Sequence, residues 1–288
     1  MPQQQRTSRR RRSQLVRELS RRFSEHELPI YASAIAFRAL IAVVPLVLLG
    51  LGLLGALGLQ STWHDTIAPA IEPRVLPEVY DGINATANKI LSSGTAGVIT
   101  FALLLVIWDL SIGVAAIMRA LNLIHDVKED RPWLRRVAVA VGLAVAVCLC
   151  VLAAMLLLVA GPRAGGALEV VLGVLRWLLA PLLLALAVGL LVRFAPAEKP
   201  EARWASAGSL LVIVVWIVAT ILFRLWVTYV ADFKSATGAL TGLLLVTLYV
   251  FVTAAIFLVG AELDELLRKE TRGRGVALPD LVTAIVRR

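Results

Sequence analysis

Charged side chains inside long apolar runs are the residues of this sequence best placed to do chemistry. Arg38, Asp109, Arg119 and Glu262 each lie within such a run. A charge at the middle of a membrane helix costs about 2.5–3.5 kcal/mol on the mildest scales, so each needs a partner or a task. Counting residues from the ends of the runs places Arg38 at the depth of Asp109, and Arg119 at the depth of Glu262. The sequence therefore predicts two intramembrane ion pairs, whose role is either structural or functional.

Two further arginines, Arg176 and Arg224, also lie in apolar runs, and no acidic residue shares the depth of Arg176. A guanidinium carries a fork of N–H donors that matches phosphate and carboxylate groups. Both residues are therefore candidates for binding an anion or the headgroup of an anionic lipid. The alternative is that both side chains extend toward the nearest headgroups without selecting among them.

Other chemistry has little support in the sequence. His26, His64 and His125 fall in three separate stretches outside the apolar runs. The charge distribution puts these stretches on two sides of a membrane, so the histidines cannot form one metal site. No nucleophile motif, zinc motif or glycine-rich phosphate loop occurs in a usable context. We therefore expect no catalytic residue, no metal and no cofactor, and predict that the protein is not an enzyme.

The apolar runs themselves predict an all-α polytopic membrane protein. Of the 288 residues, 59% are hydrophobic and 17% are charged. The apolar residues gather in runs of about 18 or more, which is long enough to cross the hydrocarbon core of a bilayer as a helix. We predict six transmembrane helices, at about 30–59, 95–124, 137–160, 168–194, 205–230 and 238–267.

The positions of Lys and Arg predict the orientation of these helices. Cytoplasmic loops of membrane proteins carry an excess of these residues. Counting Arg193 at the end of the fourth run with those outside the runs, 21 of them fall on the side of the two termini and four on the opposite side, so both termini are predicted to be cytoplasmic. Topology thus accounts for the net charge of +9. Nucleic acid is not an expected partner, because no base-reading motif accompanies the arginines.

The predicted six-helix domain comprises residues 29–268. Two tails flank this domain, and one segment within it lies outside the membrane. Residues 1–28 form a basic tail, and positions 13–28 have the spacing of an amphipathic helix on a membrane surface. The outer segment 60–94 contains prolines, followed by the apolar stripe of a short interfacial helix. Residues 269–288 form a second basic cytoplasmic tail.

Glycines and prolines indicate how the helices pack. Gly238 and Gly242 form a GxxxG motif, which favours close contact within the chain or between two copies in a homo-oligomer. Pro45 and Pro181 each remove a backbone hydrogen bond and are expected to kink their helices. Close packing is also expected at the end of the first helix, which is crowded by Gly50, Gly52, Gly55 and Gly58.

Three stretches of the sequence carry recognisable motifs: Ala36-Phe37 with Pro45-Leu46, then Arg119-Ala-Leu-Asn122 with Arg131-Pro132-Trp133, and finally Tyr249 with Gly260-Ala-Glu262. In these motifs the sequence resembles the YihY/BrkB family of bacterial inner-membrane proteins. The likeness extends over about 30–268, and the sequence departs from it at Arg38, where the family often has Tyr. It implies six spans with intracellular ends, and a link to virulence and envelope-lipid export; some members carry a ribonuclease BN label.

The sequence and this resemblance lead to one principal functional prediction. The protein is predicted to be a transporter or export factor of the bacterial cytoplasmic membrane, with membrane lipids as partners and an anionic lipid or another envelope amphiphile as substrate. The alternative is a membrane scaffold or envelope-assembly protein that transports nothing. A membrane-tethered ribonuclease has the least support, because the sequence offers neither metal ligands nor an acid–base pair that RNA could reach.

Overall fold

The chain folds into α-helices, and no β-strand occurs in the part of the chain that the structure describes. The computed structural model describes residues 17–19, 21–93, 96–159, 167–197, 207–229 and 236–274. Short elements connect the first two long helices: α3 (Gln60–Thr62), the π-helix η1 (Trp63–Ile67), α4 (Ala68–Ile71), the 3-10 helix η2 (Glu72–Arg74) and α5 (Pro77–Ser93). The long helices are α2 (Leu28–Ala56), α6 (Ala96–Ile124), α7 (Trp133–Val159), α8 (Ala167–Phe194), α9 (Ala207–Tyr229) and α10 (Ala236–Arg274).

The helices identify an all-α polytopic membrane protein, as the composition predicts. Within the described residues, four helices are long and apolar enough to cross a membrane: α2, α6, α7 and the Leu240–Leu266 part of α10. Shorter apolar stretches occur in α8 and α9. Large apolar side chains remain exposed along these helices, as at Trp108 and Leu244, each 70% exposed. Hydrocarbon is the solvent that such a surface requires. The count of six spans and the N-in, C-in orientation remain predictions.

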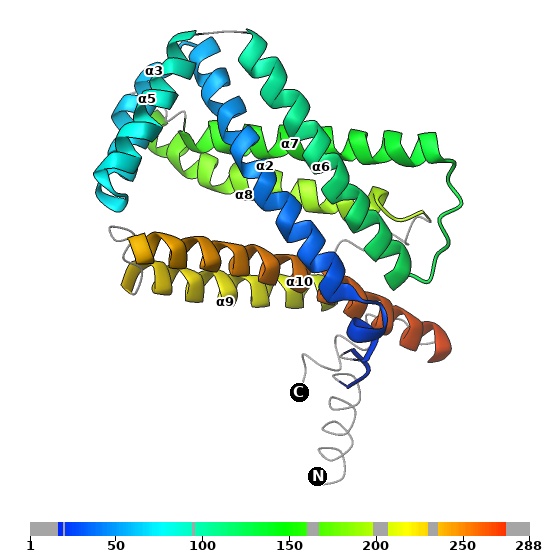
Figure 1. Ribbon diagram of the computed structural model, residues 1–288. Coiled ribbons are helices and arrows are strands. Elements are labelled where there is room, and N and C mark those ends of the chain that lie inside the picture. The colour runs from blue at the N-terminus through cyan, green and yellow to red at the C-terminus, as the bar shows by residue number, and fades with distance from the viewer. Residues whose placement is uncertain are drawn as a thin grey trace.

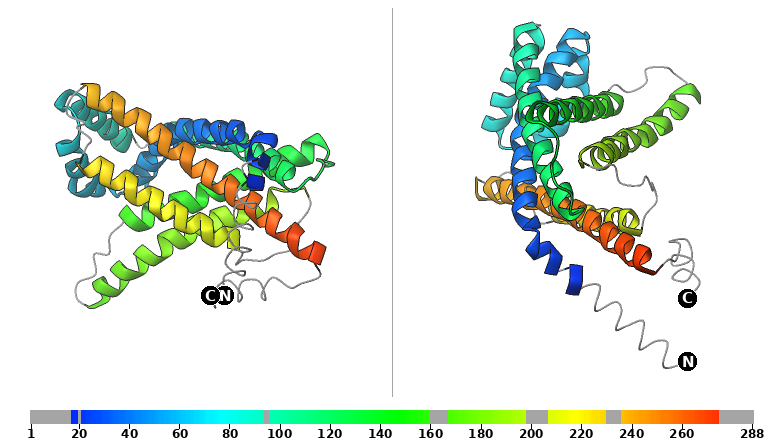
Figure 2. Two further views of the ribbon diagram at one scale, coloured as in Figure 1. Left: turned by 90° about the horizontal axis from the view of Figure 1, so that it is seen from below. Right: turned by 90° about the vertical axis from the view of Figure 1, so that its right-hand side faces the viewer.

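Helices α2 and α6 run in opposite directions, and α7 to α10 alternate in direction while lying across them (Figure 1). Helix α2 packs against α6 and α10, α7 against α6 and α8, and α9 mainly against α10. The two views in Figure 2 show α9 and α10 as a hairpin that lies across α2. We call the end at which α2 and α7 begin and α6, α8 and α10 finish the basic end of the bundle.

The largest apolar cluster lies toward the basic end. It joins α2, α6, α7 and α10 through small and large residues that alternate, including Ala32, Ala36, Met118, Leu121 and Leu258. Alanines on α2 bring its backbone close to α6, because a small side chain leaves room for close contact between membrane helices. This cluster is the frame on which the polar groups of the basic end are held.

The segments flanking the predicted membrane domain are more closely tied to it than the sequence indicates. Residues 17–19 and 21–25 are helical, and Phe23 packs against the core rather than facing lipid alone. Residues 13–16 of the predicted amphipathic helix lie outside the described residues. Helix α10 continues to Arg274, so the predicted boundary at 268 falls inside a helix, and 275–288 lie outside the described residues. Gly242 is buried within the chain, and a contact between two copies remains a prediction.

The opposite end is closed by the segment between α2 and α6. Trp63 is buried, and its indole Nε1 donates a hydrogen bond to Asn84 Oδ1 at 3.0 Å. Helix α5 packs on α2 through Ala87 and Leu91, which are both buried. Part of the predicted interfacial stripe therefore contacts protein.

Gly55 is a sensitive point of this contact. A Cβ added there would lie 2.9 Å from the backbone oxygen of Leu91, whereas one added at Gly50 would meet nothing within 4 Å. We expect Gly55→Ala to lower the melting temperature in detergent, because overpacking costs about 1–3 kcal/mol. Gly50→Ala is the matched control and should leave the melting temperature unchanged or raise it, because Ala favours helix. Equal melting temperatures for the two variants would contradict the close α2–α5 contact.

Candidate functional site: a membrane-depth ion pair and the polar basic end

The first polar feature is the predicted contact between Arg38 of α2 and Asp109 of α6. Arg38 Nη1 lies 3.0 Å from Asp109 Oδ1. Gly113 faces the stem of Arg38, since a Cβ added there would lie 3.4 Å from Arg38 Cβ, and this small residue lets the arginine approach α6. The two partners differ in exposure: the side chain of Asp109 is 8% exposed and that of Arg38 is 34% exposed. The pair is therefore open on the side of its cation.

Asp109 has a second oxygen that the arginine does not occupy. Its Oδ2 is buried and makes no hydrogen bond in the part of the chain that the structure describes. A buried carboxylate oxygen without a donor is unfavourable in a low-dielectric setting. The negative charge of Asp109 is thus compensated by Arg38 alone among the described residues, while Arg38 retains free N–H groups.

A second polar feature surrounds Glu262, which is 0% exposed on α10. His26 Nδ1 lies 3.0 Å from Glu262 Oε2, and Arg22 Nη1 lies 3.8 Å from Glu262 Oε1. Both partners come from the segment before α2. The sequence prediction that Glu262 pairs with Arg119 is therefore wrong, because Arg119 is exposed on α6. Depth along a helix fixes the height of a side chain but not the direction in which it points.

One helical turn further along α10, Glu265 has its own set of basic partners. Its side chain is 1% exposed, its Oε2 lies 2.9 Å from His125 Nδ1 and 2.7 Å from Arg268 Nη2, and its Oε1 lies 3.8 Å from Lys269 Nζ. Glu262 and Glu265 are three residues apart and so project from one face of α10. That face pairs with the segment before α2 through Glu262 and with the end of α6 through Glu265.

Sequence reasoning missed this pairing of histidines with glutamates, although a signal was present. His26 and His125 stand at the membrane ends of the first and second apolar runs, and Glu262 and Glu265 share a helix face at the end of the last run. Each histidine could have been matched to a glutamate at the same end of the bundle.

Asn122, a residue of the family-like motif, is the third polar centre of the basic end. Its Nδ2 donates to Glu129 Oε2 at 2.8 Å, and its Oδ1 accepts the backbone N–H of Ala197 at 2.7 Å. Arg131 continues the link, because its guanidinium donates to the backbone oxygens of Ala195, at 3.3 Å, and Pro196. These bonds attach the loop after α6 to the end of α8.

The loop after α6 is also attached to α10 by an ion pair outside the membrane-spanning segments. Asp126 contacts Lys269, and this hydrogen bond with the ammonium group lowers the pKa of Asp126 from its ordinary 3.8. A lowered folded-state pKa means that the pair stabilises the fold fully above about pH 4 and that the contribution disappears as pH falls below that value.

The Asp126–Lys269 pair predicts a small acid sensitivity. Between about pH 6 and about pH 3, the melting temperature of the wild type should fall more than that of Asp126→Asn, which lacks the titrating group. The effect is small because Asp126 is largely exposed. Asp130→Asn changes an exposed acid of the same loop and should follow the wild type. Identical acid profiles for the wild type and Asp126→Asn would contradict the pair.

The candidate anion ligands Arg176 and Arg224 occupy separate helices. Arg176, in α8, is half-buried, and its Nε is buried without a hydrogen bond; Arg224, in α9, is exposed. Within the described residues, no hydrogen bond or ion pair joins them to each other or to an acid. The structure thus leaves both cations available but does not bring them together, and their predicted role remains a prediction.

The remaining motif residues are structural neighbours of the site. Tyr249 of α10 stacks on Phe223 of α9, with ring centroids 4.5 Å apart, and its hydroxyl lies 3.0 Å from Thr220 Oγ1. Pro45 and Gly260 are buried, whereas Phe37 is 60% exposed on α2. In the described ranges, no cluster of three or more His, Cys, Asp or Glu residues has the arrangement of a metal site.

Fold and site together define a polytopic α-helical membrane protein whose polar groups gather at one end of the bundle and at one point within it. The family model described as "Virulence factor BrkB" matches residues 19–280. The chain belongs to this family, and with its apolar helices it is a multi-pass bacterial membrane protein.

Similar proteins occur in several bacteria. The chain is 26% identical over 275 residues to the "Putative ribonuclease-like protein YfkH" of Bacillus subtilis, covering 92% of this chain and 97% of that protein. It is 24% identical over 260 residues to a "UPF0761 membrane protein" of Xanthomonas oryzae, covering 86% of this chain and 59% of that protein. It is 25% identical over 126 residues to the "UPF0761 membrane protein NMB0524" of Neisseria meningitidis, covering 41% of this chain and 29% of that protein. No solved structure matches the chain.

Proposed function

We propose that this protein is a transporter or export factor for an anionic lipid or another envelope amphiphile. The observation that carries the proposal is the exposure of Arg38. This cation lies on a membrane-spanning helix, and its side chain is 34% exposed. A charge in a membrane helix is expensive, and residues of this kind commonly mark the path of an ion or substrate. An arginine required only for helix register would gain from being as buried as its partner.

The chemistry of the Arg38–Asp109 pair suits transient contact with a phosphate. Asp109 holds Arg38 through one N–H group and leaves the others free. A phosphate oxygen can accept from those donors without breaking the pair. Arg176 and Arg224, which have no acidic partner in the described helices, would supply further cations along the apolar surface.

The alternative proposal is a scaffold that transports nothing, and the basic end supports it. There Glu262 and Glu265 are fully buried and already paired with Arg and His side chains from three segments of the chain. Such pairs fix how helices assemble without requiring any ligand. The name of the Bacillus relative raises a ribonuclease as a third reading, and no described residue set favours it.

Reconstituted vesicles test the leading proposal. Protein would be inserted into vesicles that carry a fluorescent anionic phospholipid or a fluorescent zwitterionic one, and movement of each lipid between leaflets would be followed by quenching from outside. We expect faster movement of the anionic lipid than in protein-free vesicles. The double variant Arg38→Gln/Asp109→Asn removes both charges together and should lose most of this activity while it remains folded.

The result that would overturn transport is equally direct. If the wild type moves neither lipid faster than protein-free vesicles under any imposed ion gradient, the scaffold proposal takes its place. Arg176→Gln/Arg224→Gln provides a separate comparison: weaker movement or binding of anionic lipid at an unchanged melting temperature supports these residues as ligands. Unchanged activity would assign them to nonselective contact with headgroups.

A further inference from the structure

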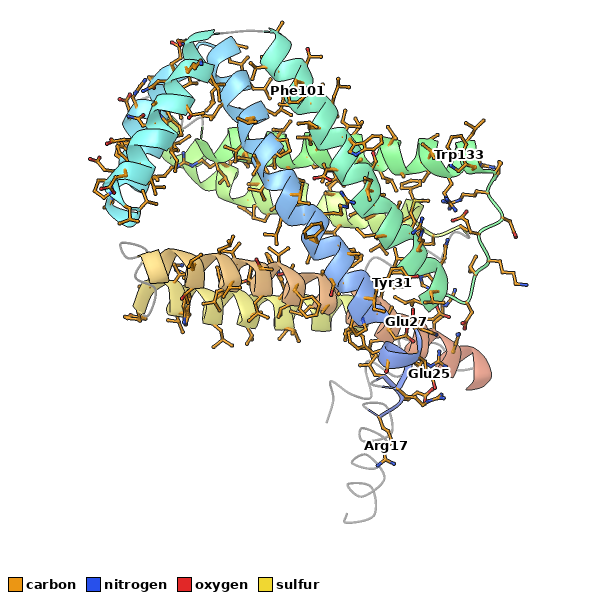
Figure 3. All side chains as sticks on the ribbon, viewed as in Figure 1. Arg17, Glu25, Glu27, Tyr31, Phe101 and Trp133 are labelled. Atoms are coloured by element: carbon orange, nitrogen blue, oxygen red, sulfur yellow. The ribbon has the colours of Figure 1, made fainter. Side chains whose placement is uncertain are left out.

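A pocket of about 220 Å³ lies at the basic end, next to the polar centre formed by Asn122 and Glu129, which both line it. Its walls come from the beginning of α2, the last turns of α6, the loop after α6 and the first turn of α7. Figure 3 shows Tyr31 near the start of α2 and Trp133 at the start of α7, where the loop after α6 ends. The polar lining consists of Tyr31, Arg119, Asn122, Glu129 and Arg136.

The charges of this pocket do not cancel. Glu129 is its one acid, and it is already occupied: Asn122 donates to its Oε2 at 2.8 Å, the backbone N–H of Arg131 donates to its Oε1 at 3.4 Å, and Arg131 Nε lies 3.8 Å from the same oxygen. Arg119 and Arg136 line the pocket as well, and neither guanidinium has an ion-pair partner in the described part of the chain. Two cations thus face one space without a matching anion.

The surroundings of the pocket are those of a membrane interface. Trp133 and Leu134, at the start of α7, are 66% and 71% exposed. Tryptophan gathers at the level of lipid headgroups, where its ring is half in water and half in hydrocarbon. The pocket also has an apolar part, which includes Met118 and Leu123. A ligand with an anionic head and an apolar body fits this combination.

We infer that the pocket formed by Tyr31, Arg119, Asn122 and Arg136 binds the phosphate group of an anionic phospholipid from the leaflet at the basic end. Two guanidinium groups can share one phosphate by charge-assisted hydrogen bonds, and the Tyr31 hydroxyl can add another. The binding site itself does not require transport. Its use as the place where a transported lipid is taken up rests on the proposed function.

The test is a lipid-binding titration of the purified protein, with native mass spectrometry as the readout. Phosphatidic acid and phosphatidylglycerol should bind more tightly than phosphatidylcholine. Arg119→Gln and Arg136→Gln should each weaken anionic lipid binding about tenfold, since a hydrogen bond to a charged group is of that strength. Arg135→Gln is the matched control, because Arg135 is exposed on the same turn of α7 and does not line the pocket. It should change affinity by less than about twofold.

Inorganic phosphate distinguishes a lipid headgroup from a free phosphate. A lipid site should retain its lipid in millimolar phosphate. Arginine-dependent binding of phosphate alone, without anionic lipid binding, would overturn the lipid assignment in favour of a soluble phosphate ligand. Equal anionic lipid affinity for the wild type and the double variant Arg119→Gln/Arg136→Gln would overturn the site altogether. So would a loss of affinity in Arg135→Gln as large as that in the pocket variants.

A measurement on the unaltered protein removes any dependence on how the variants fold. A photoactivatable phosphatidic acid, crosslinked to the wild type, should label peptides from the end of α6 or the start of α7. Labelling confined to other helices would contradict the inference. Because this readout needs no lipid movement, it separates failure of the binding site from failure of the transport proposal.

Discussion

Glu262→Gln is expected to destabilise the folded protein by about 1–3 kcal/mol. The carboxylate is 0% exposed and faces His26 and Arg22. Glutamine has nearly the same shape but no charge, so the variant removes the buried carboxylate that pairs with His26 and Arg22, while Arg22 keeps its ion pair with Glu18 at 3.1 Å. The free energy of unfolding in detergent, or the melting temperature where unfolding is irreversible, measures the loss.

Two double-mutant cycles identify the partner of Glu262. The cycle of His26→Gln with Glu262→Gln should give a coupling energy of about 1 kcal/mol or more, because the side chains touch. The cycle of Arg119→Gln with Glu262→Gln should give additivity within about 0.5 kcal/mol. Glu25→Gln, which removes an exposed acid from the same segment, is the control and should cost under about 1 kcal/mol. Coupling to Arg119 instead of His26 would contradict the arrangement described.

The fold class was predictable because hydrocarbon length and apolar composition dominate the sequence. Long helices occur where the apolar runs occur, as α6 (Ala96–Ile124) does for the run at 95–124. The continuation of α10 to Arg274 was not predictable from hydropathy, since the charged residues after Leu266 end the apolar run. Glu, Lys and Arg are good helix formers, and pairing with the loop after α6 gives this extension a packing partner.

The contacts of the site were predictable only where the depth of two residues in the membrane is enough to bring their side chains together. Arg38 and Asp109 lie on α2 and α6, which pack directly against each other, so equal depth brought them together. Arg119 has the depth expected of a partner for Glu262 but points elsewhere on α6. His26 takes its place from a segment outside the apolar run. No hydropathy argument gives the rotation of a helix about its axis or the path of a flanking segment.

The Arg38–Asp109 pair predicts unequal losses from its two single variants. Arg38→Gln strands a carboxylate whose side chain is 8% exposed and which already has one oxygen without a donor in the described part of the chain. Asp109→Asn strands an arginine whose side chain is 34% exposed and can extend toward water or a headgroup. Arg38→Gln should therefore approach the loss of about 3–5 kcal/mol seen for a broken buried pair, and Asp109→Asn should lose much less. The double variant should recover most of the loss, since Gln and Asn form a neutral pair.

This inequality also separates the two proposed functions, when it is measured together with lipid movement. A pair that only sets helix register gains nothing from an exposed cation, so a stable double variant should then behave as the wild type in vesicles. A pair that presents its cation to an anionic headgroup loses that contact in the double variant whatever its stability. Recovered melting temperature with lost movement of anionic lipid would assign the charge of Arg38 to transport. If the double variant recovers both the melting temperature and the movement of anionic lipid, the transport proposal loses the observation on which it depends. Equal losses of stability in Arg38→Gln and Asp109→Asn would have the same consequence.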